Sequence, residues 1–138
     1  MRLNMNHFQK EQTPTLNEEE KNIRILKLRQ QVVANVWIQA IAGLSEAAAV
    51  TKLYYLEEQV PGSLEIVHGV WIQVIGTILE AIGLSEQLVT EDDSEFFYGQ
   101  RHAVTGDWIQ SLGGIIEAVG GERVLQDAIR QRDEDLVP

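Results

Sequence analysis

One tripeptide occurs three times in this chain, and each copy contains one of the three tryptophans. The copies are Trp37-Ile38-Gln39, Trp71-Ile72-Gln73 and Trp108-Ile109-Gln110, separated by 34 and 37 residues. The likeness continues on both sides, with valine four residues before each Trp and Glu-Ala at nine and ten residues after it. The repeated glutamates are Glu46, Glu80 and Glu117. Periods of 20–50 residues indicate repeat units, each of which needs neighbours in order to bury a face.

The spacing inside each unit is helical. A helix turns by about 100° per residue. One side of such a helix therefore holds each Trp together with the apolar residues four before it and four, seven and eleven after it. The repeated Gln and Glu lie on the opposite side. No alternating run of β-branched residues occurs, so the sequence predicts an all-α fold. We expect the Trp stripes to face a common core and the Gln and Glu side chains to make hydrogen bonds between units or subunits. The alternative is an exposed Trp edge that binds a partner or a membrane interface.

Small residues form a second stripe in each unit. They stand five residues after each Trp, at Ala42, Gly76 and Gly113, and twelve after it, at Ala49, Gly83 and Gly120. Glycine inside a helix costs about 1 kcal/mol relative to alanine, so its repeated use needs a reason. Close approach of a second helix is one reason, and a C-terminal cap is the other. We expect close packing at the first set and helix ends at Gly83 and Gly120.

The boundaries of the units follow from capping and breaking residues. Thr15 with Glu18 resembles a capping box that starts the first helix, which either continues through Gly43 or breaks there. Pro61-Gly62 predicts a stop, Ser63 the next start, and Ser94 or Asp93 a later cap. A rival repeat alignment, in which Gly43-Leu44-Ser45-Glu46 matches Gly83-Leu84-Ser85-Glu86, remains open. We expect a flexible tail over 1–14 and one domain over 15–138, with units at about 30–60, 64–100 and 101–135. Five or six helices would form antiparallel hairpins within it.

Composition excludes several classes of function. The chain has 138 residues, a formal net charge of -10 and no Cys, which disfavours nucleic-acid binding and excludes disulfides and thiolate metal sites. His7, His68 and His102 stand in unrelated contexts without metal-ligand spacing, and the acidic run Glu91–Glu95 is interpreted as a solvated turn. No nucleophile motif or phosphate loop occurs. We therefore expect no enzyme activity, no metal and no cofactor.

Charge and hydropathy are unevenly distributed. Residues 1–34 carry a net charge of +2 and residues 35–138 one of -12, and Lys21, Arg24, Lys27 and Arg29 form a basic patch. This patch is expected to dock onto an acidic repeat surface in its own chain or in a partner. The stretch 66–84 is long enough to cross a bilayer, but His68, Gln73 and Glu80 interrupt it. The N-terminus has no secretory signal pattern, so we expect a cytoplasmic protein and no membrane partner.

The Trp-Ile-Gln-x-Ile/Leu-Gly/Ala pattern followed by Glu-Ala-Ile/Val-Gly resembles the repeat of a family of small repetitive helical proteins from spore-forming Gram-positive bacteria, whose function is unknown. The resemblance covers about residues 30–125. Ala42 and Ala49 stand where the family has glycines, and the basic N-terminal segment has no counterpart in the repeat. The resemblance implies a bacterial, cytosolic helical protein and brings no activity with it.

Two functions from different classes remain at this stage. The first is a non-enzymatic scaffold or interaction module that associates with itself as a homo-oligomer, with a dimer favoured because three units leave one stripe without a partner. The second is a peripheral membrane protein that uses its Trp- and Gly-rich amphipathic helices. The Gln and Glu on the polar face favour the first, because helices at the membrane interface favour Lys and Arg there.

Overall fold

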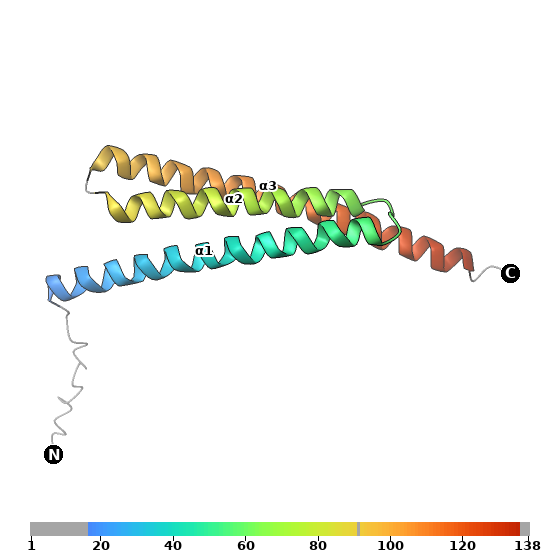
Figure 1. Cartoon of the computed structure of the whole chain (residues 1–138), viewed down its shortest axis with the longest axis horizontal. Coiled ribbons are helices and arrows are strands. Elements are labelled where there is room, and N and C mark those ends of the chain that lie inside the picture. The colour runs from blue at the N-terminus through green and yellow to red at the C-terminus, as the bar shows by residue number, and fades with distance from the viewer. Residues whose placement is uncertain (1–16, 91, 136–138) are drawn as a thin grey trace, which may run out of the picture.

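In the computed structural model, which describes residues 17–90 and 92–135, the chain forms three long helices. They are α1 (Glu18–Leu56), α2 (Ser63–Val89) and α3 (Asp93–Asp135), and these residues contain no strand. Consecutive helices run antiparallel, and α2 packs against both α1 and α3 (Figure 1). The prediction of an all-α fold is confirmed. The tail predicted over 1–14 lies outside the described residues.

The helix ends follow local capping chemistry. Asn17 caps α1, since its side-chain oxygen accepts a hydrogen bond from the backbone N–H of Glu19 at 3.0 Å. The predicted cap Thr15 lies outside the described residues. Gly62 adopts a left-handed φ of 102° between Pro61 and the start of α2, as the predicted stop requires. At α3 the carboxylate of Asp92, rather than Ser94 or Asp93, accepts the capping bond from the backbone N–H of Ser94 at 2.7 Å.

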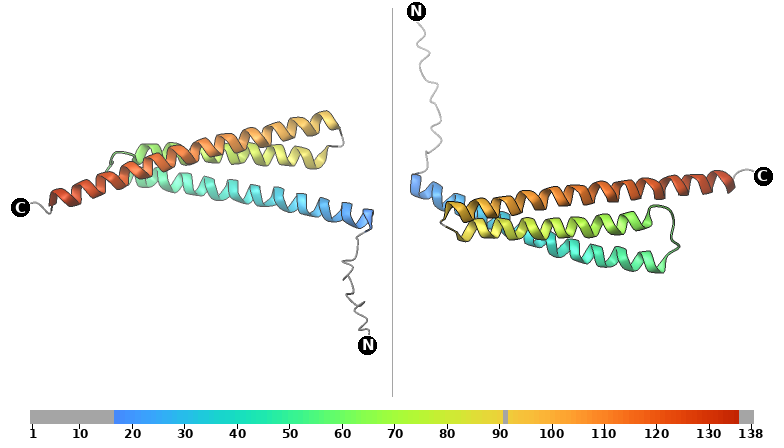
Figure 2. Two further views of the ribbon diagram at one scale, coloured as in Figure 1. Left: turned by 180° about the vertical axis from the view of Figure 1, so that it is seen from behind. Right: turned by 90° about the horizontal axis from the view of Figure 1, so that it is seen from above.

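The prediction of five or six helices is wrong, because Gly83 and Gly120, which were expected at helix ends, lie inside helices. Of the two alternatives at Gly43, the continuous helix is the one observed. The helix α1 continues through Gly43, α2 continues through Gly83, and α3 continues through Gly120. The last two occupy the contact between α2 and α3, so tertiary packing offsets their helix-propensity cost. The result is three long rods, of which α3 continues past the turn between α1 and α2 (Figure 2).

The contact between α2 and α3 is a seam of paired glycines. The pairs are Gly62 with Gly120, Gly69 with Gly113, Gly76 with Gly106, and Gly83 with Gly99. A Cβ added at Gly69 would lie 2.5 Å from the backbone N of Glu117, and one added at Gly106 would lie 2.5 Å from that of Glu80. The two backbones therefore touch, and the close packing expected at Gly76 and Gly113 is confirmed. The same expectation is wrong at Ala42, which is exposed.

The contact between α1 and α2 is built from small side chains instead. Ala47 on α1 forms a buried cluster with Val70 and Val74 on α2, and Val36 and Ala40 are also buried on α1. Two indoles add hydrogen bonds between the helices. Trp37 Nε1–H donates to Ser85 Oγ at 3.1 Å, and Trp71 Nε1–H donates to Thr51 Oγ1 at 3.0 Å. Ser85 stands fourteen residues after Trp71, and Thr51 stands fourteen residues after Trp37. The two bonds are therefore reciprocal, since each helix supplies one donor and one acceptor at equivalent positions.

The prediction that the Trp stripes form the core is wrong. Trp37, Trp71 and Trp108 are 39%, 38% and 68% exposed, whereas the buried apolar residues are all Val or Ala. No large side chain among the described residues is fully buried. Helices that approach through Gly and Ala leave no room for indoles between them, so the large side chains lie on the outside.

Candidate functional site

The repeated polar side chains gather in a groove over α2. A cavity of about 240 Å³ lies between the three helices, and Gln39, Gln73, Gln110, Glu46 and Glu117 help to line it. Val70, Val74 and Thr77 of α2 and Ala42 and Gly43 of α1 complete its lining. All three repeated glutamines and two of the three repeated glutamates therefore meet at one place, and we call it the polar groove.

Hydrogen bonds hold the floor of the polar groove. The side-chain amide of Gln73 on α2 donates to the carboxylate of Glu117 on α3. Thr77 Oγ1–H donates to the backbone carbonyl of Gln73 at 3.0 Å. This pairing joins α2 and α3 through one Gln and one Glu of the repeated pattern. Glu80, the third repeated glutamate, lies partly buried outside the groove and beside Asp107 of α3.

Each of the three helices exposes large apolar side chains near its middle. Ile38 and Ile41 on α1 are 63% and 65% exposed, Ile75 on α2 is 56% exposed, and Ile115 on α3 is 60% exposed. The Gln73, Gln110 and Glu117 side chains are less exposed than these isoleucines. The usual arrangement of a soluble protein is thus partly reversed across the middle of the molecule, because Gln73, Gln110 and Glu117 are half-buried while large apolar groups lie outside. The other two side chains of the groove, Gln39 and Glu46, are exposed.

Glutamate contacts mark the two ends of the α2–α3 pair. Glu65 near the start of α2 forms a salt bridge with Arg123, and the carboxylate of Glu86 near its end lies 2.8 Å from His102 Nδ1, within hydrogen-bond distance. The 37-residue spacing of Trp71 and Trp108 also relates Glu65 to His102 and Glu86 to Arg123. The two contacts therefore occupy equivalent positions in the sequence pattern, one at each end of the pair.

The groove offers binding groups rather than catalytic ones. Its lining holds amide donors, carboxylate acceptors and the Thr77 hydroxyl, without a Cys, His or Lys. No group of three His, Cys, Asp or Glu residues that could hold a metal ion occurs in the described part of the chain. Chemically, the polar groove can hold water or the polar side chains of another helix.

A second cavity, of about 300 Å³, is one that the repeat pattern did not indicate. It lies between the first half of α1 and the turn that joins α2 to α3, and aliphatic side chains form most of its wall. The sequence contained one relevant feature, the run of apolar residues between Ile23 and Val33 alongside the basic patch. Without the fold, nothing connected that run to Leu84, Leu88 and Phe96.

Comparisons of the chain with protein-family models, with curated proteins and with solved structures found no match. The resemblance to the repetitive bacterial family therefore stays a prediction.

Proposed function

We propose that this protein is embedded in a lipid bilayer through the outer apolar surfaces of its helices. The observation that carries the proposal is the reversed distribution of side chains. Ile38, Ile41 and Ile115 are each at least 60% exposed, while Gln73 and Glu117 are half-buried and bond to each other between α2 and α3. In water the exposure of so many large apolar side chains is unfavourable, whereas hydrocarbon solvates them and favours polar groups that face inward.

Helix length supports the proposal. Both α1 and α2 contain apolar stretches long enough to cross a bilayer, and only 17% of that stretch in α1 and 44% of that in α2 is buried. A core helix of a soluble protein passes the same test of length and composition, but it is mostly buried. Residues 30–51 of α1 carry a single charge, Glu46 in the polar groove, and span about 33 Å at 1.5 Å per residue. The hydrocarbon layer is about 30 Å thick.

The glycine seam supports it as well. Inside a bilayer the hydrophobic effect does not drive helices together, so their contacts are enriched in small residues that let the backbones touch. The pairs Gly69–Gly113 and Gly76–Gly106 provide such a contact. Polar residues within membrane segments face the interior of a bundle, as Gln73, Gln110 and Glu117 do here.

We also infer that the three helices are copies of one unit centred on its Trp. The reciprocal bonds of Trp37 and Trp71 support this inference for α1 and α2. The four reciprocal glycine pairs support it for α2 and α3. Each pair of neighbouring helices thus repeats its contacts about a local two-fold axis.

The test of membrane embedding is flotation combined with fluorescence quenching. Reconstituted protein should float with phosphatidylcholine vesicles and resist extraction by alkaline carbonate. In the double variant Trp37→Phe/Trp71→Phe, the remaining Trp108 should be quenched by brominated lipid and protected from iodide. Protein that remains at the bottom of the gradient, with Trp108 open to iodide, would overturn the proposal.

A second candidate is the self-associating scaffold expected from the sequence, and the exposure of α3 favours it. Trp108 is 68% exposed, whereas Trp71 on the neighbouring helix is 38% exposed and bonded to α1. A second copy that covers α3 would bury the same kind of face. Light scattering after size-exclusion chromatography without detergent should then return a dimer, and a mass near 15.5 kDa would count against it.

A further inference from the structure

We propose that the cavity between the start of α1 and the α2–α3 turn binds an anionic phospholipid, with its phosphate on Arg29 and one acyl chain along the aliphatic wall. The proposal rests on the membrane embedding proposed above and names a lipid class that the embedded protein selects. The cavity measures about 300 Å³, which is at the small end of ligand sites and suits part of one acyl chain.

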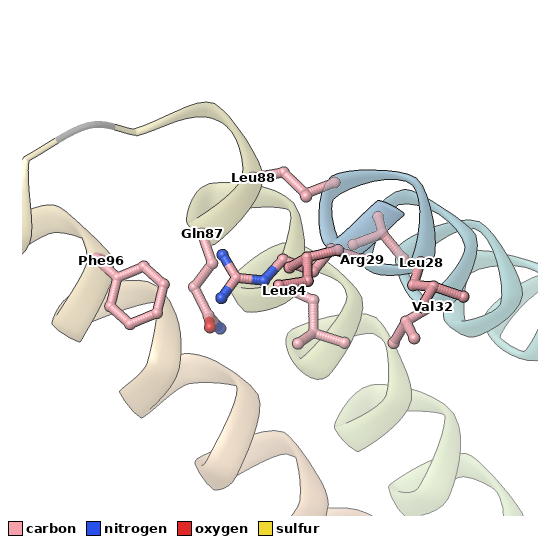
Figure 3. A pocket seen from close by; sticks show the side chains of 9 residues that line it. Leu28, Arg29, Val32, Leu84, Gln87, Leu88 and Phe96 are labelled. Carbon is pink, nitrogen blue, oxygen red and sulfur yellow. The ribbon is translucent and has the colours of Figure 1, made fainter. Parts of the chain in front are cut away.

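The wall of the cavity is built by all three helices. Leu28 and Val32 of α1 face Leu84 and Leu88 of α2, and Phe96 of α3 closes one side (Figure 3). Ile25 and Val33 complete the apolar lining. The site has the two parts that an amphiphile requires, an apolar body and a polar rim formed by Arg29 and Gln87.

Arg29 supplies the charge of that rim. Its guanidinium extends from α1 across the cavity toward Gln87 (Figure 3). Among the residues that the structure describes, no carboxylate lies within 4.0 Å of it. The planar guanidinium matches a phosphate with two parallel hydrogen bonds, which makes Arg the preferred partner of this group.

The position along the molecule fits a lipid headgroup. Arg29 is the last charge on α1 before the uncharged stretch 30–45, so it stands where the polar headgroups meet the hydrocarbon. Arg24 and Lys27 lie within two turns of it, and basic residues near a membrane surface attract anionic lipids. An acidic repeat surface was expected to hold this basic patch. Among the described residues the patch makes one ion pair, between Lys21 and Glu18 of its own helix, at 3.6 Å.

Lipid selection is the property to measure. Protein in detergent is titrated with dioleoyl-phosphatidylglycerol or dioleoyl-phosphatidylcholine, and retained lipid is counted by native mass spectrometry. Wild type should retain one phosphatidylglycerol in preference to phosphatidylcholine, and Arg29→Gln should weaken that binding about tenfold. Leu28→Trp, which fills the cavity and keeps the charge, should weaken it to a similar extent. Lys52→Gln is the matched control, because it removes one positive charge at the other end of α1, away from the cavity, and it should bind as wild type.

The outcomes separate this site from the proposed function. Equal retention of the two lipids, or equal binding by wild type and Arg29→Gln, would overturn the site even if the protein floats with vesicles. If wild type does not float yet binds dispersed dihexanoyl-phosphatidylglycerol in a way that depends on Arg29, the site stands and the membrane embedding fails. Competition by inorganic phosphate at millimolar concentration would assign the site to the free anion and overturn the lipid proposal.

Discussion

The two helix contacts of this protein achieve close packing in different ways. Between α2 and α3 the glycines Gly69, Gly76 and Gly106 let the backbones touch, whereas between α1 and α2 the buried residues are Val and Ala. At these three glycines the nearest atoms of the facing helix are backbone atoms, which cannot move aside when volume is added. The second contact has side chains that can shift, because a Cβ at Gly43 would meet only the Val74 methyl at 3.0 Å. We therefore expect the two contacts to respond very differently to the same change in volume.

The largest effect should come from adding one methyl group to the seam. In Gly76→Ala the Cβ would lie 2.6 Å from the carbonyl O of Gly106, so α2 and α3 must separate. We expect a loss of about 3 kcal/mol in the free energy of unfolding. Chemical denaturation followed by circular dichroism measures it.

Gly121→Ala is the matched control for that experiment. Gly121 lies in the middle of α3 with nothing within 4 Å of an added Cβ, so the substitution should stabilise by about 0.5–1 kcal/mol through helix propensity. If Gly76→Ala and Gly121→Ala changed the free energy of unfolding in the same direction, the distinction between seam glycines and open glycines would be refuted.

A smaller effect is expected at the contact between α1 and α2. Ala47 is 1% exposed, and Ala47→Leu overfills the cluster with Val70 and Val74 at a cost of about 1–3 kcal/mol. Because α3 does not take part in this cluster, amide hydrogen exchange should rise in α1 while α2 and α3 remain protected around the seam. Ala48→Leu, at the exposed neighbouring position, should change stability by less than about 0.5 kcal/mol. Equal loss of protection in all three helices would show that the contacts are not independent.

Substitution of Trp71 and of Trp108 should differ by about 1 kcal/mol in the free energy of unfolding that is lost. Trp71→Phe removes the hydrogen bond from Nε1–H to Thr51 and should cost about 1 kcal/mol. Trp108 has no such partner among residues 17–90 and 92–134, so Trp108→Phe should be nearly neutral for folding. Thermal unfolding of both variants beside wild type checks the order, and a larger loss for Trp108→Phe would contradict it.

The smallest effect concerns the cap of α3. Hydrogen bonds from Ser94 hold the pKa of the Asp92 carboxyl below its usual range. A lowered pKa in the folded state means that the capping contribution is present above the ordinary Asp pKa of 3.8 and is lost as the pH falls through the folded value. The thermal midpoint of wild type should therefore decrease slightly more than that of Asp92→Asn between pH 6 and pH 3. If the thermal midpoints of wild type and Asp92→Asn fell equally between pH 6 and pH 3, this carboxylate would have no role in pH-dependent stability.

Much of the helical content was predictable because it depends on local patterns. The seven-residue spacing from Gly76 to Gly83 and the Pro61-Gly62 break lie in the sequence, and they correspond to a helix seam and a turn. The helix count was not predictable in the same way. A glycine at position 83 is equally compatible with a cap and with a helix contact, and only the presence of Gly99 across the seam decides between them.

The polar groove was predictable in its residues but not in its geometry. Repetition singled out Gln73 and Glu117, but their contact required the antiparallel pairing of α2 with α3. The cavity beside Arg29 had no such repeated pattern, because Arg29 and Leu84 belong to different helices and meet only through the α1–α2 pairing.

By itself the sequence determined that this chain is helical, that its helices carry one repeated pattern, and that each has an apolar side and a side with Gln and Glu. Local periodicity is sufficient for these conclusions, since a helix sets the direction of every side chain relative to its neighbours. Only the tertiary structure decided which side faces inward. Because Gly and Ala allow the backbones to approach more closely than any large side chain would permit, the helices meet through their small residues and place Trp37, Trp71 and Trp108 outside.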